Sequence, residues 1–231
     1  MALDLDNLDA EIAILSVPSG LPYVVDNLAN DQSRAPDAIR QNAQDAAWEE
    51  PCTRVHFDWD LGGPLLDNRP IKVVDCGNVT ADKFDPYEHY RQAEVATGKI
   101  FQSGATLITL GGDHSIPIPI LRALPKNEKV TLVQVDAHMD CRHGQDRPAG
   151  RWERANRGYR SREISWRGPF SAYEMHDIGM DAVLDRIPGG GPYYLTVDAD
   201  GLDPTIMPAV NAPTPGGLTW IQTHKLIHGL V

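Results

Sequence analysis

Cysteine is scarce in this sequence: its 231 residues include three, at positions 52, 76 and 141, and no two of them form a Cys-x-x-Cys pair. Such an odd, widely spaced set does not provide the disulfide framework that small secreted domains need. Reduced thiols in the cytoplasm are the better interpretation. The first 20 residues also lack a basic segment followed by a long apolar core, so we expect no signal peptide.

Long apolar stretches and an excess of positive charge are missing as well. A membrane-spanning helix needs about 20 consecutive apolar residues, and no segment of the sequence approaches that length. Asp and Glu (32) outnumber Lys and Arg (21), which gives a formal net charge of −11, spread along the chain. This balance argues against binding to nucleic acid or to an anionic membrane surface, and it favours the attraction of small cationic molecules.

Five short apolar runs, each bounded by turn-forming residues, predict the strands of the fold. They are mostly continuous rather than alternating, as in strands buried on both faces of a parallel sheet. The runs span residues 11–17, 71–77, 104–112, 129–137 and 191–199. Segments of helical composition lie between them, at 84–104, 116–127 and 177–191. Alternating strands and helices predict an α/β fold with three αβα layers, in which helices cover both faces of a parallel sheet.

Segments rich in proline and glycine, at 18–22, 62–70 and 204–217, are interpreted as loops rather than linkers between domains. The length of the chain suits one globular domain with a substantial core. We therefore expect a single domain over residues 1–231.

Acidic and histidine residues follow three of the predicted strands. They stand in the segments GGDHS (111–115), DAHMD (136–140) and DADGLD (198–203). Ligands of open parallel sheets bind at the carboxyl ends of strands, so the three segments are expected to converge on one pocket. Within the second segment, Asp136, His138 and Asp140 point the same way if the chain stays extended past the strand.

This concentration of carboxylates predicts a cation. Burying unpaired carboxylates costs on the order of several kcal/mol each, whereas divalent metal ions neutralise several of them together. Each segment alone also has a structural interpretation, because Gly-Gly-Asp and Asp-x-Asp are common in turns. Their occurrence at the ends of successive strands favours a shared metal site.

These segments resemble, in order, the three signatures of the ureohydrolase family, which includes arginase, agmatinase and the guanidino-acid hydrolases. The third signature extends to residue 219, and residues 17–40 resemble the family's substrate-side loop. The sequence is most similar to the agmatinase, guanidinobutyrase and guanidinopropionase side of the family. The resemblance implies an arginase-like αβα domain that forms a homo-oligomer, either a trimer or a hexamer.

The resemblance also implies two Mn²⁺ ions. One would be held by His114, Asp136, Asp140 and Asp198, and the other by His138, Asp136, Asp198 and Asp200. Carboxylates with one imidazole per metal suit Mn²⁺, while Ni²⁺, Co²⁺ and Zn²⁺ accept the same ligand types and stay open as alternatives.

By the same resemblance, the implied reaction is hydrolysis of a linear guanidino compound, agmatine or a guanidino acid, to urea and an amine. Asp140 would accept a proton from the attacking water and pass it to the leaving amine. His143 is a second catalytic candidate, as a proton shuttle, although an exposed loop histidine explains it equally well. Four arginines either meet a substrate carboxylate or belong to a solvated loop. They are Arg142, Arg147, Arg151 and Arg154.

Two departures from the family pattern leave other functions open. Near residue 170 the sequence has no counterpart of a further strand and helix that relatives usually have there. The sequence also stops before the family's carboxyl-terminal strand, which carries a guanidinium-binding glutamate. Either the protein is a shortened relative or the sequence omits segments of a longer protein, and the intact flanking motifs favour the second. A formimidoyl-group hydrolase of the same fold and a non-catalytic metal-binding partner subunit are therefore the alternatives.

Overall fold

The fold is described from a computed structural model. The structure describes residues 4–20, 31–44, 57–60, 62–64, 66, 69–80, 86–125, 128–138 and 169–230. The chain forms two compact units, Met1–Pro125 and Lys126–Val231, and each is described by itself. That the whole chain is a single domain stays a prediction.

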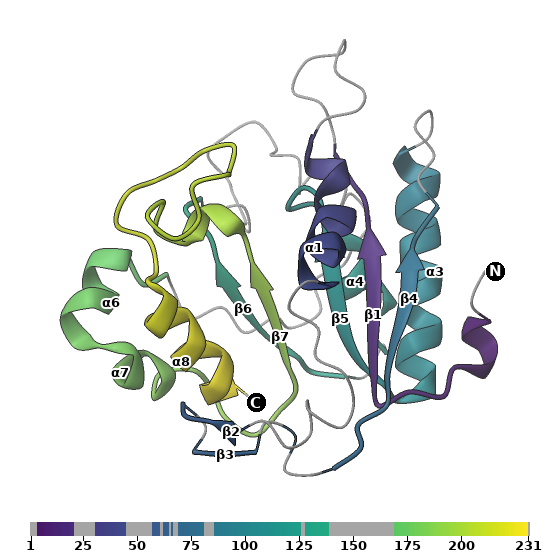
Figure 1. The fold of residues 1–231 in the computed structure, drawn as a ribbon, viewed down its shortest axis with the longest axis horizontal. Coiled ribbons are helices and arrows are strands. Elements are labelled where there is room, and N and C mark those ends of the chain that lie inside the picture. Colours follow the sequence, from purple (N-terminus) through teal and green to yellow (C-terminus); the bar gives the residue numbers. More distant parts are fainter. Residues whose placement is uncertain are drawn as a thin grey trace. The chain divides into compact units, whose positions relative to one another are not determined.

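The first unit is built on a parallel sheet of three strands. β1 (Ile12–Val17) pairs on one side with β4 (Val73–Asn78) and on the other with β5 (Thr106–Gly111) (Figure 1). As the middle strand, β1 is covered on both faces, and Ala13 and Leu15 are buried together with its last two residues. This position explains why its sequence is almost continuously apolar, with Ser16 as the exception, instead of alternating.

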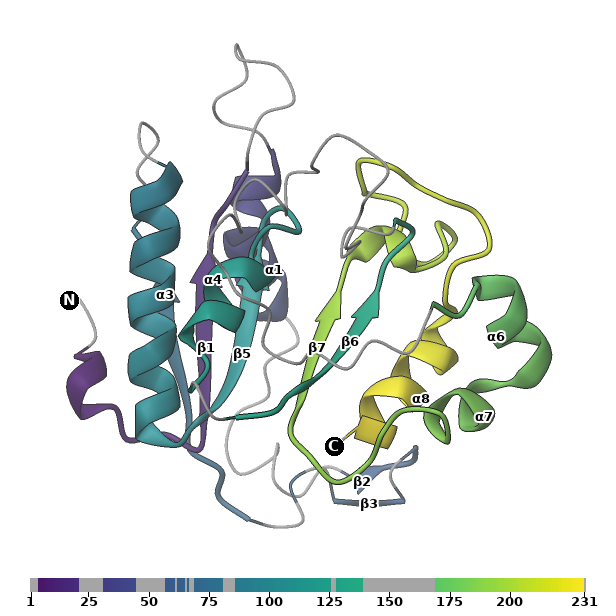
Figure 2. The same ribbon diagram turned by 180° about the vertical axis from the view of Figure 1, so that it is seen from behind.

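Helices cover both faces of this sheet. α1 (Ala35–Gln44) lies on one face, whereas α3 (Pro86–Ser103) and α4 (Pro117–Ala123) lie on the other, as the two opposite views show (Figures 1 and 2). The first unit therefore has the three αβα layers that the sequence predicts. Short elements complete it: η1 (Leu5–Asn7), η2 (Asp31–Arg34) and the antiparallel pair β2 (Phe57–Asp58) and β3 (Gly63–Pro64).

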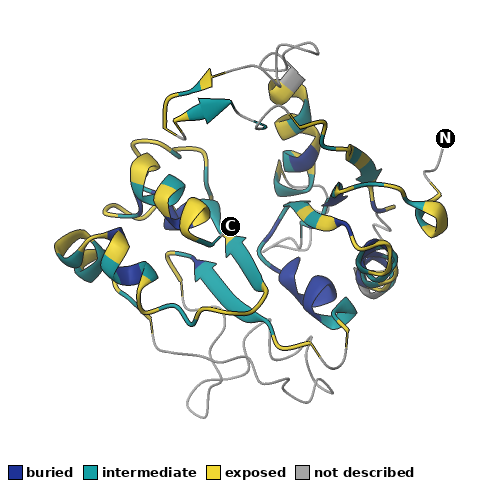
Figure 3. Ribbon diagram, turned by 90° about the horizontal axis from the view of Figure 1, so that it is seen from below, coloured by how far each residue is buried: buried dark blue, intermediate teal, exposed yellow. Residues whose placement is uncertain are grey.

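The spacing of buried residues explains how the helices pack. α3 buries Tyr90, Ala93, Thr97 and Ile100, which recur every three or four residues and so form one side of the helix. α4 buries Pro117–Leu121 and is among the dark blue segments of Figure 3. Within the described segments, no helix is long and apolar enough to cross a membrane.

The second unit contains two parallel strands, β6 (Thr131–Val135) and β7 (Tyr193–Val197), paired residue for residue along their whole length. Among the described residues of this unit, three α-helices accompany them: α6 (Ala172–Ile178), α7 (Met180–Leu184) and α8 (Trp220–Leu230). A separate apolar core stabilises this unit. Its buried members are Val135, Met180, Val183, Leu202, Leu218 and Leu226.

All five predicted strands are present, with ends within a few residues of the apolar runs. The prediction of a helix over 177–191 was wrong in its bounds. Helix α6 begins after Ser171, whose hydroxyl accepts a hydrogen bond from the backbone N–H of Glu174 at 3.1 Å. It ends at Gly179, whose φ of 81° breaks the helix before α7 begins.

Candidate metal centre

The carboxyl ends of β6 and β7 place two acidic segments side by side. Val135 pairs with Val197 at the ends of these strands, and the backbone N–H of Asp198 donates to the carbonyl oxygen of Val135 at 2.8 Å. The chain then continues through Asp136 after β6 and through the short helix η3 (Ala199–Gly201) after β7. The parallel pairing therefore brings acids 62 positions apart in the sequence to the same edge.

Asp136, His138 and Asp200 form a compact cluster of ligand atoms. Each offers one atom that lies within 4.8 Å of those of the other two, and Asp198 has a carboxylate oxygen within the same distance of Asp136. The Nδ1 atom of His138 lies 3.1 Å from Oδ2 of Asp200 and 3.6 Å from Oδ1 of Asp136. One imidazole thus faces a group of carboxylates.

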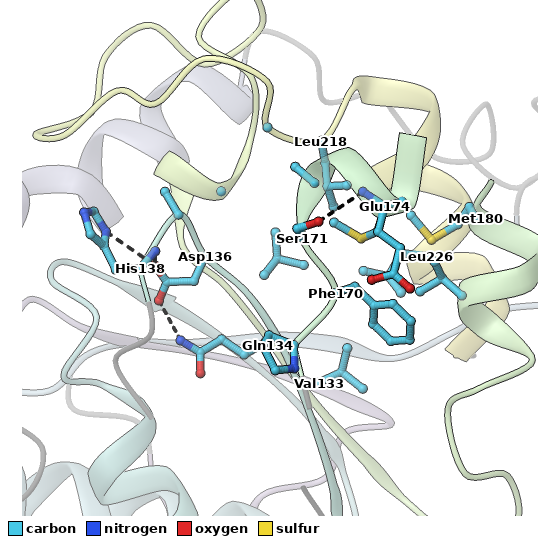
Figure 4. Close-up of a pocket in the computed structure, with 18 of the residues that line it drawn as sticks. Val133, Gln134, Asp136, His138, Phe170, Ser171, Glu174, Met180, Leu218 and Leu226 are labelled. Atoms are coloured by element: carbon cyan, nitrogen blue, oxygen red, sulfur yellow. Dashed lines mark hydrogen bonds and ion pairs between the residues drawn. The ribbon is translucent and has the colours of Figure 1, made fainter. Parts of the chain in front are cut away.

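The cluster is closed on the acidic side and open on the histidine side. The side chains of Asp136 and Asp200 are 3% and 10% exposed, whereas that of His138 is 51% exposed. A cavity of about 650 Å³ adjoins it, with Asp136 and His138 in its lining and mainly apolar side chains such as Phe170 and Leu226 elsewhere (Figure 4). A small molecule can therefore approach from the imidazole side.

Hydrogen bonds from the backbone orient the carboxylates. The N–H of His138 donates to Oδ1 of Asp136 at 2.6 Å, and the N–H of Ala137 donates to Oδ1 of Asp200 at 3.1 Å. The N–H of Asp200 donates to Oδ1 of Asp198 at 3.2 Å. A backbone N–H therefore fixes the direction of each of the three carboxylates.

Gln134 is a site residue that the sequence analysis missed. Its side-chain amide donates to Oδ2 of Asp136 at 2.6 Å (Figure 4). It stands two positions before Asp136, so it projects from the same face of the extended chain. A neutral polar residue inside an apolar strand was the available signal.

The electrostatics of the cluster favour a bound cation. Burial raises the pKa of Asp200 above its ordinary value, and the negative charges of Asp198 and Asp136 raise it further. A group of carboxylates that destabilise one another in their ionised form is stabilised by a divalent ion, which interacts with all of them. The donor set, oxygen with imidazole, fits a metal such as Mn²⁺.

Gly201 allows the two strand ends to approach closely. A Cβ atom built at this position would lie 2.6 Å from the backbone nitrogen of Asp136 and 2.8 Å from Cγ1 of Val135. Both contacts are shorter than real Cβ atoms allow, so η3 reaches the end of β6 only because residue 201 has no side chain.

Of the six metal ligands that the sequence predicts, the structure brings together Asp136, His138, Asp198 and Asp200. His114 belongs to the first unit, where it follows β5 in the turn that precedes α4. Asp140 and His143 lie outside the described residues.

Comparison with known proteins supplies a second line of information. A family model described as "Arginase family" matches residues 10–156 and 154–231. The chain is 33% identical to an agmatinase from Photorhabdus laumondii, over 96% of this chain and 75% of that protein. It is also 33% identical to an agmatinase from Edwardsiella ictaluri, over 93% of this chain and 75% of that protein.

Solved structures with the same fold have related descriptions. A hypothetical agmatinase from Burkholderia thailandensis matches with a TM-score of 0.73 at 26% identity, over 98% of this chain and 74% of that one. The agmatine ureohydrolase of Thermoplasma volcanium matches with a TM-score of 0.68 at 25% identity, over 99% and 79%. An arginase from Bacillus subtilis, at 20% identity and a TM-score of 0.66, shares the fold. The predicted arginase-like α/β fold with a parallel sheet is thereby confirmed.

Proposed function

Because the chain belongs to the arginase family, we propose that it hydrolyses a C–N bond of a linear guanidino compound to give urea and an amine. The observation that carries this proposal is the Asp136, His138 and Asp200 cluster at the joined ends of β6 and β7. Relatives described as agmatinases support agmatine, or a guanidino acid of similar length, as the substrate.

We propose two Mn²⁺ ions as the cofactors. His114, Asp136, Asp140 and Asp198 would hold one, and His138, Asp136, Asp198 and Asp200 the other. When bound, such ions would supply a nucleophile by lowering the pKa of a water molecule toward neutrality. The oxygen-rich ligand set supports Mn²⁺, and Ni²⁺, Co²⁺ and Zn²⁺ are the alternatives to test.

The residues of the chain have separate roles in this proposal. The N–H of His138 and the amide of Gln134 fix the direction of Asp136, so that its oxygens are pre-organised before any ligand arrives. Asp140 takes a proton from the attacking water and delivers it to the leaving amine. His143 is proposed as a separate shuttle that carries protons between the site and solvent.

The charge of the protein supports a cationic substrate. With a net charge of −11, the chain attracts a guanidinium group and repels anions at long range. If Arg142, Arg147, Arg151 or Arg154 instead binds a substrate carboxylate, a guanidino acid is preferred over agmatine. The two kinds of substrate therefore differ in the group at the end away from the guanidinium, which is a positively charged amine in agmatine and a negatively charged carboxylate in a guanidino acid.

A substrate panel tests the proposal directly. Protein incubated with Mn²⁺ is assayed for urea with agmatine, arginine, 4-guanidinobutyrate, 3-guanidinopropionate and guanidine. We expect urea from agmatine or from one of the two guanidino acids. Formamide from a formimidoyl substrate would point to the alternative hydrolase, and bound metal without any product would point to a non-catalytic partner subunit.

The first prediction concerns Asp136. Substitution of Asp136→Asn keeps an acceptor for the N–H of His138 but removes the negative charge proposed to contact both ions, so urea release should fall by at least about 100-fold. Asp177→Asn, which changes an exposed aspartate of α6, is the matched control. Equal activity of the two variants would contradict the proposed role of Asp136.

Assembly and location are further parts of the proposal. The trimer or hexamer implied by the family is tested by the mass of the metal-bound protein in solution. The cytoplasmic location stays a prediction.

A further inference from the structure

A buried cluster of polar side chains surrounds the turn that carries His114. The turn joins β5 to α4 and contains Asp113 and Ser115, which are 8% and 7% exposed. Two further polar residues meet it from distant parts of the first unit: Ser19, just after β1, is 5% exposed, and Tyr90, on α3, is 9% exposed. Four polar side chains in one buried place require mutual hydrogen bonds.

The hydrogen bonds of this cluster run in one direction. The hydroxyl of Ser115 donates to Oδ1 of Asp113. Because the only proton of that hydroxyl is used in this way, Tyr90 must donate its own proton to Oγ of Ser115, which lies 2.6 Å away. Ser19 Oγ lies 3.4 Å from both hydroxyl oxygens. The result is a chain of hydrogen bonds from Tyr90 through Ser115 to the Asp113 carboxylate, in which each bond polarises the next.

The same residues fix the backbone on both sides of His114. The N–H of Ser115 donates to Oδ1 of Asp113 at 3.2 Å, and the N–H of Asp113 donates to the carbonyl oxygen of Ser19 at 2.9 Å. At Gly112 a Cβ atom would lie 1.7 Å from that carbonyl oxygen, so the turn is in direct contact with the segment after β1. Residues 112, 113 and 115 are thus held in place, and residue 114 stands between them.

We infer that Tyr90 is a positioning residue for His114. Its hydroxyl fixes Ser115 and, through it, the Asp113 carboxylate, so that the backbone from which the His114 side chain projects is held in the place required of a metal ligand. This inference rests on the proposed function, because it requires His114 to bind metal. A hydroxyl on α3 then sets the affinity of a metal site that it does not touch.

Removal of that single hydroxyl tests the inference. Tyr90→Phe leaves the aromatic ring in place but deprives Ser115 of its donor. We expect the affinity for Mn²⁺, measured by calorimetric titration of the metal-free protein, to fall about 10-fold. Tyr193→Phe is the matched control: its hydroxyl donates to the carbonyl oxygen of Pro188 at 3.0 Å, in the second unit, and its loss should leave Mn²⁺ affinity unchanged.

A second variant separates positioning from general stability. In a His114→Asn background, Tyr90→Phe should cause no further loss of Mn²⁺ affinity, because the ligand that it positions is gone. An unaltered Mn²⁺ affinity in the Tyr90→Phe single variant, or an equal further loss in the His114→Asn background, would overturn the inference. If the wild-type protein itself binds no Mn²⁺, the proposed function fails; if it binds Mn²⁺ and Tyr90→Phe binds it equally, only the role of Tyr90 fails.

Discussion

A single missing side chain decides how closely the acidic segments meet. Gly201 has no positive φ that would demand glycine, and its requirement comes from space alone, since the backbone of Asp136 occupies the place of a Cβ atom. The contact is with main chain, which cannot rotate away as a side chain can. The identity of residue 201 is therefore coupled to the geometry of the acids on both sides of it.

We predict that Gly201→Ala separates the two strand ends. Overpacking of this kind costs about 1 to 3 kcal/mol, and the displaced Asp200 should also bind metal more weakly. Urea denaturation and metal titration measure the two effects. Gly189→Ala is the control, because a Cβ atom there meets nothing within 4 Å; similar losses in both variants would contradict the explanation.

At the scale of elements, Arg40 connects a helix to the edge of the sheet. From α1 its guanidinium donates two hydrogen bonds, each 2.7 Å long, to the carboxylate of Asp75 on β4, and a further one to Asn78. The hydrogen bonds from Arg40 lower the pKa of Asp75 below its ordinary value. This two-pronged geometry distinguishes the pair from ordinary surface ion pairs.

Substitution of Arg40→Gln should destabilise the protein by about 1 kcal/mol at neutral pH. Because the folded-state pKa of Asp75 is lowered, this stabilisation is present above the pKa of an unfolded aspartate and is lost as the pH falls through the lower folded-state value. The difference between variant and wild type in unfolding free energy should therefore shrink in acid. Arg34→Gln, whose exposed partner Asp31 lies 3.8 Å away, should change stability little at any pH.

The elements that the sequence predicted are those with continuous apolar runs. β1 was found because burial on both faces leaves a local signal, and β5 because its apolar run is continuous although its residues are only partly buried. The two-residue strands β2 and β3 leave none, since a pair of residues has no periodicity. The break at Gly179 was missed because glycine inside a helical pattern is compatible with either a continuous helix or an end.

The residues of the candidate metal site were likewise predicted only in part. Asp136, His138 and Asp200 were predicted because each stands in a short segment after an apolar run, and parallel strands bring such segments together. Gln134 contacts Asp136 two positions along its own chain, and the polar residue inside an apolar run was the available signal. Tyr90 instead contacts the turn that carries His114 from a helix more than 20 positions earlier. Side-chain hydrogen bonds between distant elements have no pattern in the sequence.

At the scale of the whole molecule, the excess negative charge supports the proposed metal binding. The chain carries a net charge of −11, and the residues of the metal cluster concentrate part of that charge in one place. The chain also spans about three quarters of the length of the curated relatives that it matches.

Metal removal should therefore lower the stability of the whole protein. An ion that binds only the folded state at 100 times its dissociation constant stabilises it by about 2.7 kcal/mol. We expect a lower melting temperature in EDTA and its recovery when Mn²⁺ is added in excess. In the Asp136→Asn variant EDTA and Mn²⁺ should have little effect; identical melting of wild-type protein with and without EDTA would contradict metal binding.

Because β6 and β7 pair without interruption, the number of residues in each strand determines where the acids that follow it lie. Thr131 faces Tyr193 and each following pair stays in step up to Val135 and Val197, so the acids after both strands arrive together. One residue inserted into either strand would shift its remainder and turn every later side chain to the opposite face. Insertions and deletions among homologues are therefore expected in the loop after Asp203, which lies beyond η3. Within the two strands themselves they should be absent.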